Sequence, residues 1–247
     1  EMRESDWSSD VCSSDLTSFF KGVVTVAGLS NKSAAYSGTA QTADISSATY
    51  DPADIDTSHI YAGGGRNAGT YSAIYSDQQG YDLVNTNTLK ISPKKLTATL
   101  TGKTGNTYAF TKAYDGTDSV TKNLVLGTTY TFGDQVISGD TVSIDAAKAV
   151  GAYAGKNVGD DKTISYNGIT LTGADAGNYT IDGTLSGNVG QITKKDITAS
   201  LNGSYVFTKT YDGNTDVKQA LGNNYSFATG DVEKGDKVSL TAGVGAY

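Results

Sequence analysis

The stretch Phe110-Thr-Lys-Ala-Tyr-Asp-Gly116 recurs almost unchanged as Phe207-Thr-Lys-Thr-Tyr-Asp-Gly213, displaced by 97 residues. That displacement equals the length of a small domain, so the 247-residue chain reads as a tandem array of domain-sized repeats. Two further pairs of landmarks keep nearly the same spacing: Gly139-Asp140 with Gly235-Asp236, and Gly151-Ala-Tyr153 with Gly245-Ala-Tyr247. The turn in this stretch therefore marks the same place in successive units.

The boundaries between the repeats are marked by lysine pairs. Lys94-Lys95 and Lys194-Lys195 each lie between the apolar end of one strand pattern and the start of the next. We expect a diverged repeat at residues 17–93, a complete one at 94–193 and a truncated one at 194–247. Linkers this short do not behave as flexible tethers.

The middle repeat alternates apolar and polar residues over short stretches, which is typical of half-buried antiparallel strands. The whole chain has 30 Gly, 16 Tyr and only two Pro, a composition that fits a turn-rich, all-β protein. Asn167-Gly168 predicts a two-residue hairpin that would pair Tyr166 with Ile169 and Ile164 with Leu171. A single long strand with a bulge at Gly168 is the alternative.

A second motif, Asp175-Ala-Gly177-Asn-Tyr179, has the spacing of the tyrosine corner of immunoglobulin-type sandwiches. In such a corner the Tyr hydroxyl bonds to backbone a few residues upstream. Asn67-Ala-Gly-Thr-Tyr71 echoes the motif, so we expect Tyr71 and Tyr179 to be equivalent corner residues. The predicted fold is a row of tandem immunoglobulin-like β-sandwich domains, with a β-grasp-like, mostly β arrangement as the alternative. An ordinary Asx turn before a strand would also explain the motif.

The first sixteen residues have a different origin. Residues 6–16 agree at every position with the in-frame translation of a common sequencing-library adapter, so we interpret residues 1–16 as a translated artefact and exclude them from fold reasoning. They contain the chain's only Met, Cys and Trp: Met2, Cys12 and Trp7. Without them the net charge changes from −7 to −3, and no disulfide or thiol chemistry remains.

Composition and motifs argue against several classes of function. There is no apolar run long enough for a membrane span and no basic surface for nucleic acid. His59 is the only imidazole, so we expect no catalytic, cofactor-binding or metal site and no enzyme activity. The glycine-rich segment 63–69 lacks phosphate-loop spacing and is predicted to be a flexible loop. Calcium binding is a lesser alternative for five acids: Asp51, Asp54, Asp56, Asp160 and Asp161.

Together, Tyr114-Asp115-Gly116, Gly139-Asp140, Lys156-Asn-Val-Gly159 and the Asp175–Tyr179 motif resemble the YDG repeat of large bacterial surface proteins. Residues 17–93 are similar to the related MBG-type repeat, with Ser37 in place of Asp. Such repeats occur in filamentous-haemagglutinin-like exoproteins and adhesins, which implies export to the cell surface in association with the outer membrane. The resemblance implies no catalytic residues.

The same resemblance implies partners: an outer-membrane secretion component and, for the intact protein, a host-surface glycan or protein. We interpret Tyr114-Asp115-Gly116 and Tyr211-Asp212-Gly213 structurally, as turns in which Asp forms the turn and Gly supplies a positive φ. The predicted function is a spacer or stalk that projects a distal binding region. The alternative is that the repeats are themselves adhesive modules.

Overall fold

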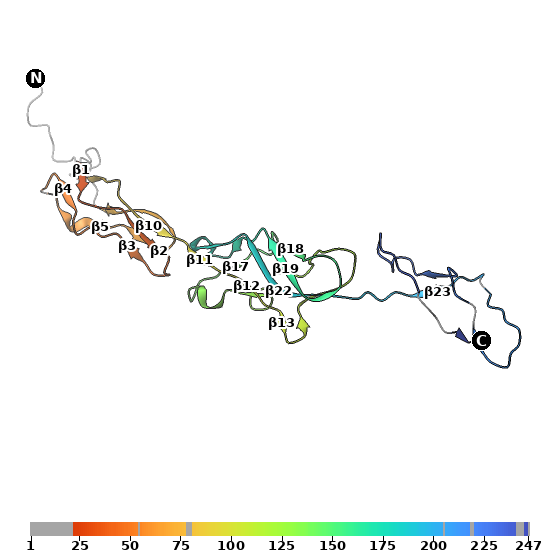
Figure 1. Cartoon of the computed structure of the whole chain (residues 1–247). Helices are drawn as coiled ribbons and strands as arrows, with labels where there is room; N and C mark the ends of the chain where they lie inside the picture. Colours follow the sequence, from red (N-terminus) through yellow and green to blue (C-terminus); the bar gives the residue numbers. More distant parts are fainter. Residues whose placement is uncertain are drawn as a thin grey trace, which may run out of the picture. The chain divides into compact units, whose positions relative to one another are not determined.

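The computed structural model describes residues 22–53, 55–77, 81–204, 206–217, 220–240 and 245–246 (Figure 1). Within these ranges all regular structure is β-strand or short 3-10 turn, with no α-helix. The prediction of a mostly β protein is therefore confirmed. The strands form many small sheets, and the predicted pair of stacked sheets in each repeat is not shown by the described residues. The interpretation of residues 1–16 as an artefact falls outside the described residues.

The chain divides into two compact units. The first comprises residues up to Ala98 together with Phe132–Ala147 and Ile169–Gly183. Its elements are β1 (Gly22–Ala27), β2 (Lys32–Ala35), β3 (Gln41–Thr42), β4 (Thr49–Asp51), η1 (Thr57–His59), β5 (Ile60–Ala62), β6 (Gly64–Gly65), β7 (Gly69–Ser72), β8 (Ile74–Ser76), β9 (Tyr81–Val84), β10 (Thr88–Ser92), β11 (Lys94–Leu96), η2 (Gly133–Gln135), β17 (Ser143–Ile144), β20 (Leu171–Thr172), η3 (Ala176–Asn178) and β21 (Tyr179–Ile181).

The second unit comprises Thr99–Thr131, Lys148–Gly168 and Thr184–Tyr247. Its elements are β12 (Thr99–Leu100), β13 (Lys103–Thr104), β14 (Thr107–Tyr108), β15 (Phe110–Ala113), β16 (Tyr130–Thr131), β18 (Val150–Tyr153), β19 (Gly159–Asn167), β22 (Thr184–Thr193), β23 (Ala199–Leu201), β24 (Asp216–Val217), β25 (Tyr225–Phe227) and β26 (Gly245–Ala246). The units therefore cut across the sequence repeats, because the middle repeat contributes segments to both units.

The first two repeats share one strand topology. In the first, β10 runs parallel to β2 and antiparallel to β7. In the second, β22 runs parallel to β15 and antiparallel to β19. The registers also correspond, because Ile91 opposes Gly69 and Ile192 opposes Gly159. Two diverged sequences thus specify the same pairing.

Apolar side chains of each unit are buried in the alternating pattern that half-buried strands require. In the first unit the core includes Val24, Leu89, Ile91 and Leu96, each at most 1% exposed. In the second unit it includes Phe110, Tyr130, Ile164 and Ile192. Beyond Thr193, no described residue is buried, and Leu201 and Val206 are more than half exposed. The last part of the chain therefore adds strands without adding to the core.

The predicted hairpin at Asn167-Gly168 is wrong. Gly168 does have a positive φ of 72°, but the chain does not fold back on itself there. Tyr166 instead opposes Gly151 on β18 and Leu185 on β22. Leu171 pairs with Ile144 on β17. Long-range pairing thus overrides the local Asn-Gly signal, and Gly168 only redirects the chain between two sheets.

Candidate functional site

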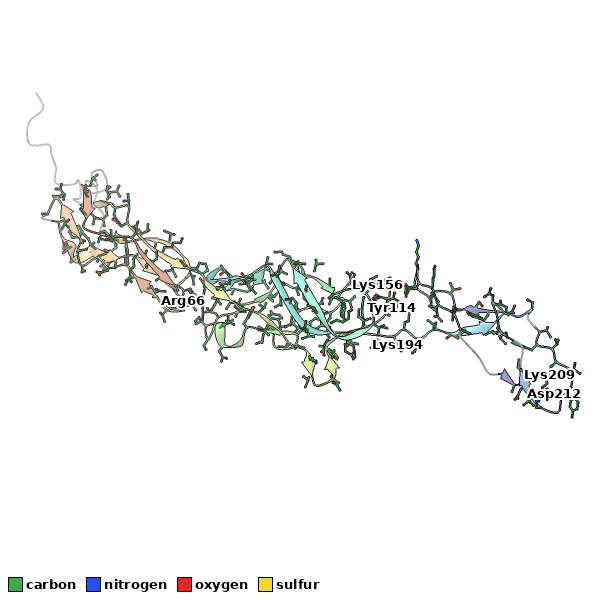
Figure 2. All side chains as sticks on the ribbon, in the orientation of Figure 1. Arg66, Tyr114, Lys156, Lys194, Lys209 and Asp212 are labelled. Atoms are coloured by element: carbon green, nitrogen blue, oxygen red, sulfur yellow. The ribbon has the colours of Figure 1, made fainter. Side chains whose placement is uncertain are left out.

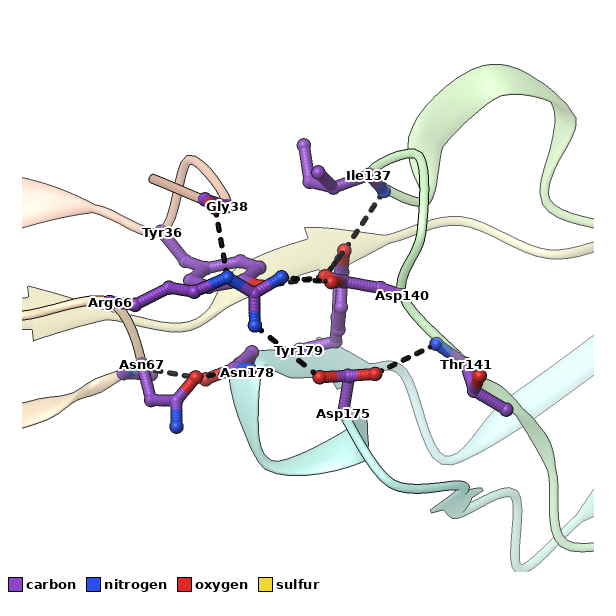
Figure 3. Close-up of polar contacts among 11 residues, drawn as sticks. Tyr36, Gly38, Arg66, Asn67, Ile137, Asp140, Thr141, Asp175, Asn178 and Tyr179 are labelled. Atoms are coloured by element: carbon purple, nitrogen blue, oxygen red, sulfur yellow. Dashed lines mark hydrogen bonds and ion pairs between the residues drawn. The ribbon is translucent and has the colours of Figure 1, made fainter. Parts of the chain in front are cut away.

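The most elaborate polar site in the first unit surrounds the carboxylate of Asp140, whose side chain is completely buried (Figure 3). The hydroxyls of Tyr36 and Tyr179 donate to its Oδ2 at 2.6 and 2.7 Å. Arg66 Nη2 donates to its Oδ1 at 2.5 Å. Tyr36 and Arg66 come from the first repeat, and Asp140 and Tyr179 from the second. The site is therefore a junction between repeats.

The Arg66 guanidinium connects both sides of this junction. Its Nε donates to the Gly38 carbonyl at 2.9 Å, and Nη1 lies 3.6 Å from Asp175 Oδ1. The Asp175 carboxylate is fixed in turn because its Oδ2 accepts the Thr141 N–H at 2.9 Å. A planar guanidinium can contact several acceptors at once, and Arg66 contacts Gly38, Asp140 and Asp175 in this way (Figure 3).

Two asparagines extend the contact. Asn178, only 5% exposed, accepts the Ala68 N–H through its Oδ1 at 2.8 Å. Its Nδ2 donates to Asn67 Oδ1 at 3.2 Å. The rings of Tyr36 and Tyr179 meet edge to face with centroids 5.4 Å apart. The buried polar atoms of the junction are thus paired, as a stable buried network requires.

The electrostatics follow from burial and hydrogen bonding. Burial opposes ionisation of Asp140, but the bonds from Tyr36, Tyr179 and Arg66 outweigh it and hold the pKa of this carboxyl below its usual range. Burial and the bond to Asp140 raise the pKa of Tyr179 to about 12. The pKa of Tyr36 is raised for the same reasons. At neutral pH the Asp140 carboxylate is therefore surrounded by the Arg66 guanidinium and two neutral phenols.

The predicted Tyr-Asp-Gly turn forms one side of a second junction. Lys112 Nζ donates to Asp115 Oδ1 at 2.8 Å, and the same oxygen accepts the Thr117 N–H at 2.9 Å. The hydrogen bond from Lys112 lowers the pKa of Asp115 to about 2. Gly116 has a φ of 74°, as the turn requires. The loop thus holds the preceding Tyr114 in a defined position.

At this second junction Tyr114 donates to Asp236 Oδ2 at 2.7 Å. Lys156 Nζ lies 3.7 Å from Asp236 Oδ1 and 6.0 Å from the centre of the Tyr114 ring. Figure 2 shows Tyr114 and Lys156 next to each other. A tyrosine, a carboxylate and a cation therefore meet again, with the carboxylate now in the third repeat.

The two junctions use equivalent positions. A Cβ added at Gly38 would lie 2.5 Å from Ile137 Cγ2, and one added at Gly116 would lie 3.3 Å from Glu233 Cβ. Ile137 and Glu233 each precede the junction Asp by three residues. The cations correspond as well: Arg66-Asn-Ala-Gly69 and Lys156-Asn-Val-Gly159 each lead into the strand that pairs with the last strand of the repeat. The second junction thus repeats three features of the first: the Tyr-Asp hydrogen bond, the turn glycine and the cation.

The expected equivalence of Tyr71 and Tyr179 is wrong. Tyr71 lies on β7, which corresponds to β19, whereas Tyr179 begins β21. By strand register the residue of the first repeat that corresponds to Tyr179 is Tyr81, because β9 pairs with β1 as β21 pairs with β11. Tyr71 does donate to the carbonyl of Asn67, four residues upstream, at 2.8 Å. Tyr179 instead accepts the Ile137 N–H at 2.9 Å.

The glycine-rich segment 63–69 is not a free loop. A Cβ added at Gly63 would collide with the Ser72 carbonyl oxygen, and one at Gly64 with that of Gln41. Close backbone approach therefore explains these glycines, and β6, which begins at Gly64, leads directly to Arg66. Gly177, by contrast, has open space around it and no positive φ. The sequence signal that identifies Arg66 is its shared Arg/Lys-Asn-x-Gly pattern with Lys156.

The remaining candidates are peripheral. His59 Nδ1 lies 3.0 Å from Asp77 Oδ1 on an exposed surface. Asp56 caps η1, Asp160 accepts from Gln191, and Asp161 pairs with Lys103. Among the residues placed in the structure no group of three metal-ligating side chains is found, and no helix is long and apolar enough to cross a membrane. The polar contacts described above therefore serve recognition between repeats.

Comparisons with known proteins add one assignment. A search of curated proteins found no match to the chain, and a search of solved structures also found none. A family model does match the middle of the chain, over the segment that supplies Tyr114, Asp140 and Tyr179. Residues 92–187 of this chain are a YDG domain, a type of domain typical of repeats in bacterial surface proteins.

Proposed function

We propose that this chain is a spacer segment of a large exported adhesin on a bacterial cell surface, in which tandem repeats project a distal binding region. The observation that carries the proposal is the buried Asp140 carboxylate, which receives Tyr36 and Arg66 from one repeat and Tyr179 from the next. A junction held by several directional bonds resists bending, which is what a spacer needs.

Two further features support a spacer. Only Pro93 separates β10 from β11, so the first linker has little freedom of its own. The Tyr-Asp bond with its neighbouring cation recurs at the second junction. Repeat arrays gain their properties from intrinsic repeat stability plus interfaces with nearest neighbours, and these contacts are such interfaces.

The stiffness of the first junction tests the proposal. Spin labels at Val23→Cys and Thr180→Cys, in a Cys12→Ser background, report a distance distribution across it by pulsed electron resonance. We expect one narrow distribution that broadens in Asp140→Asn and stays narrow in Asp56→Asn, a control in the first repeat outside the junction. An equally broad distribution in the parent chain and in Asp140→Asn would rule out a stiff spacer.

A second function, direct adhesion by the repeats, is favoured by one observation. Tyr61 and Tyr75 lie opposite each other on β5 and β8, 37% and 52% exposed, with ring centroids 5.5 Å apart. Exposed aromatic faces are suited to stacking on sugars. A glycan array probed with the full chain, with Tyr75→Ser and with Tyr211→Ser as the control decides between the classes. Binding that Tyr75→Ser abolishes and Tyr211→Ser leaves intact would favour adhesion.

Two finer assignments belong to the same proposal. We take each repeat to be an immunoglobulin-like sandwich, supported by the alternating burial of Ile164 and Tyr166 on β19 and by the Tyr71 bond to Asn67. We take the first repeat to be MBG-type, supported by the strand topology that it shares with the YDG domain. A crystal structure of the chain would test both.

A further inference from the structure

The turn Tyr211-Asp212-Gly213 does not take part in a junction with another repeat among the described residues. Tyr211 is 92% exposed, whereas Tyr36 is 3% exposed at the first junction. Among the residues that the structure describes, the Tyr211 hydroxyl has no hydrogen-bond partner. Docking at this position would remove the aromatic ring from water and give its hydroxyl a partner.

The loop around Tyr211 already has the conformation of an occupied junction. Lys209 Nζ lies 2.7 Å from Asp212 Oδ1, the same pairing as Lys112 with Asp115 (Figure 2). Gly213 has a φ of 78°, next to 74° at Gly116 and 78° at Gly38. The loop therefore has the geometry of an occupied junction without a partner, and such preorganisation lowers the entropic cost of docking.

We propose that Tyr211 and Gly213 form a docking surface for the Gly-Asp turn of a further YDG-type repeat. The occupant is defined by the two occupied junctions. Its Asp carboxylate accepts the Tyr211 hydroxyl, as Asp236 accepts Tyr114. The residue three before that Asp packs on the turn glycine, as Glu233 does on Gly116. The proposal rests on the spacer function, because it assigns the partner of the next junction.

An extended chain tests this inference. Because Gly151-Ala-Tyr153 aligns with Gly245-Ala-Tyr247, a second copy of residues 154–247 appended after Tyr247 completes the third repeat and adds a new Gly-Asp turn. The appended copy carries Tyr211→Phe, so that only the original Tyr211 is followed. Nitration by tetranitromethane, followed by peptide mass spectrometry, measures the access of reagent to Tyr211. We expect nitration of Tyr211 to slow about tenfold or more relative to the parent chain, the factor expected from one hydrogen bond to a charged group.

The controls separate this inference from the spacer function. Asp236→Ala in the appended copy alone should restore nitration of Tyr211, and the same change in the original copy should expose Tyr114 only. Tyr211 that stays fully reactive while Tyr114 stays protected would overturn the docking proposal and leave the spacer proposal standing. Loss of protection at Tyr114 in the parent chain would instead count against the spacer.

A loop graft covers the case in which the extended repeat does not fold. Four substitutions, Ala113→Thr, Thr117→Asn, Asp118→Thr and Ser119→Asp, convert residues 110–120 to the sequence of 207–217. In this variant the third-repeat loop faces the existing Asp236. Protection of Tyr114 equal to that in the parent chain supports the proposed recognition, and nitration as fast as that of Tyr211 contradicts it.

Discussion

Replacing Tyr179 by Phe removes two hydrogen bonds at the first junction while keeping the ring. The hydroxyl donates to the buried Asp140 carboxylate and accepts the Ile137 N–H. The edge-to-face contact with Tyr36 remains possible, so the variant isolates the polar contribution. Tyr71→Phe is the matched control, because its hydroxyl makes one bond to the Asn67 carbonyl at a more exposed site.

The expected cost follows from the type of each bond. A hydrogen bond to a charged group contributes about 1.5–3 kcal/mol, and one between neutral groups about 0.5–1.5 kcal/mol. Tyr179→Phe should therefore lower the free energy of local opening by about 2–4 kcal/mol. Tyr71→Phe should lower it by about 0.5–1.5 kcal/mol. An ordinary tyrosine corner with one backbone bond would predict the same small effect for both.

Amide hydrogen exchange on the full chain measures these effects locally. A loss of 2–4 kcal/mol corresponds to exchange about 30- to 700-fold faster for amides that open with the junction, such as those of residues 137–145. Amides of β22 serve as the internal reference. Acceleration of less than about threefold in Tyr179→Phe, or an equal effect of Tyr71→Phe, would refute the assignment of Tyr179 to a charged junction bond.

Two further predictions concern pH and glycine. The pKa values of Asp115 (about 2) and Asp140 are lowered, so their contributions to stability are complete above the unfolded value of about 4 and are lost as pH falls through the folded values. Tyr179, with a pKa raised to about 12, stabilises fully below about pH 10, and this contribution is lost as pH rises from there to about 12. Urea midpoints followed across pH should show both losses, and an alkaline loss undiminished in Tyr179→Phe would contradict the assignment. Gly173→Ala should destabilise by about 2 kcal/mol or more, because φ is 117° and the new Cβ would collide with the Thr141 carbonyl, whereas Gly177→Ala should change stability by less than about 0.5 kcal/mol. Equal urea midpoints for the two glycine variants would contradict this reasoning.

The sequence was sufficient for the features that depend on local chemistry. Comparing the chain with itself located the Tyr-Asp-Gly turns, because the same turn needs Gly at the same positive φ each time. Alternating apolar residues predicted the strand class because burial of one sheet face has period two. Each of these two patterns is formed by residues only a few positions apart in the chain.

Features set by long-range pairing could not be predicted. The sequence predicts a flexible loop at Arg66, because the partner that fixes this side chain, Asp140, is 74 residues away. A five-residue echo matches Tyr71 with Tyr179, although strand register assigns that place to Tyr81. The local Asn167-Gly168 signal predicts a hairpin, but β19 pairs with β18 and β22 instead. In each case the deciding contacts lie far apart in sequence.

A buried carboxylate is not the most stabilising way to join two domains, because its desolvation offsets much of the attraction to Arg66. Its advantage is selectivity: a repeat docked in the wrong register would leave the Asp140 charge buried and unpaired, which costs several kcal/mol. Arrays of similar repeats are prone to misassembly between neighbours, so a contact that penalises wrong pairs is useful. The two junctions differ in this respect, since Asp140 is fully buried beside an arginine, whereas Asp236 is 28% exposed beside Lys156. Water screens the second pair and lysine offers only a point charge, so the first junction discriminates more strongly than the second.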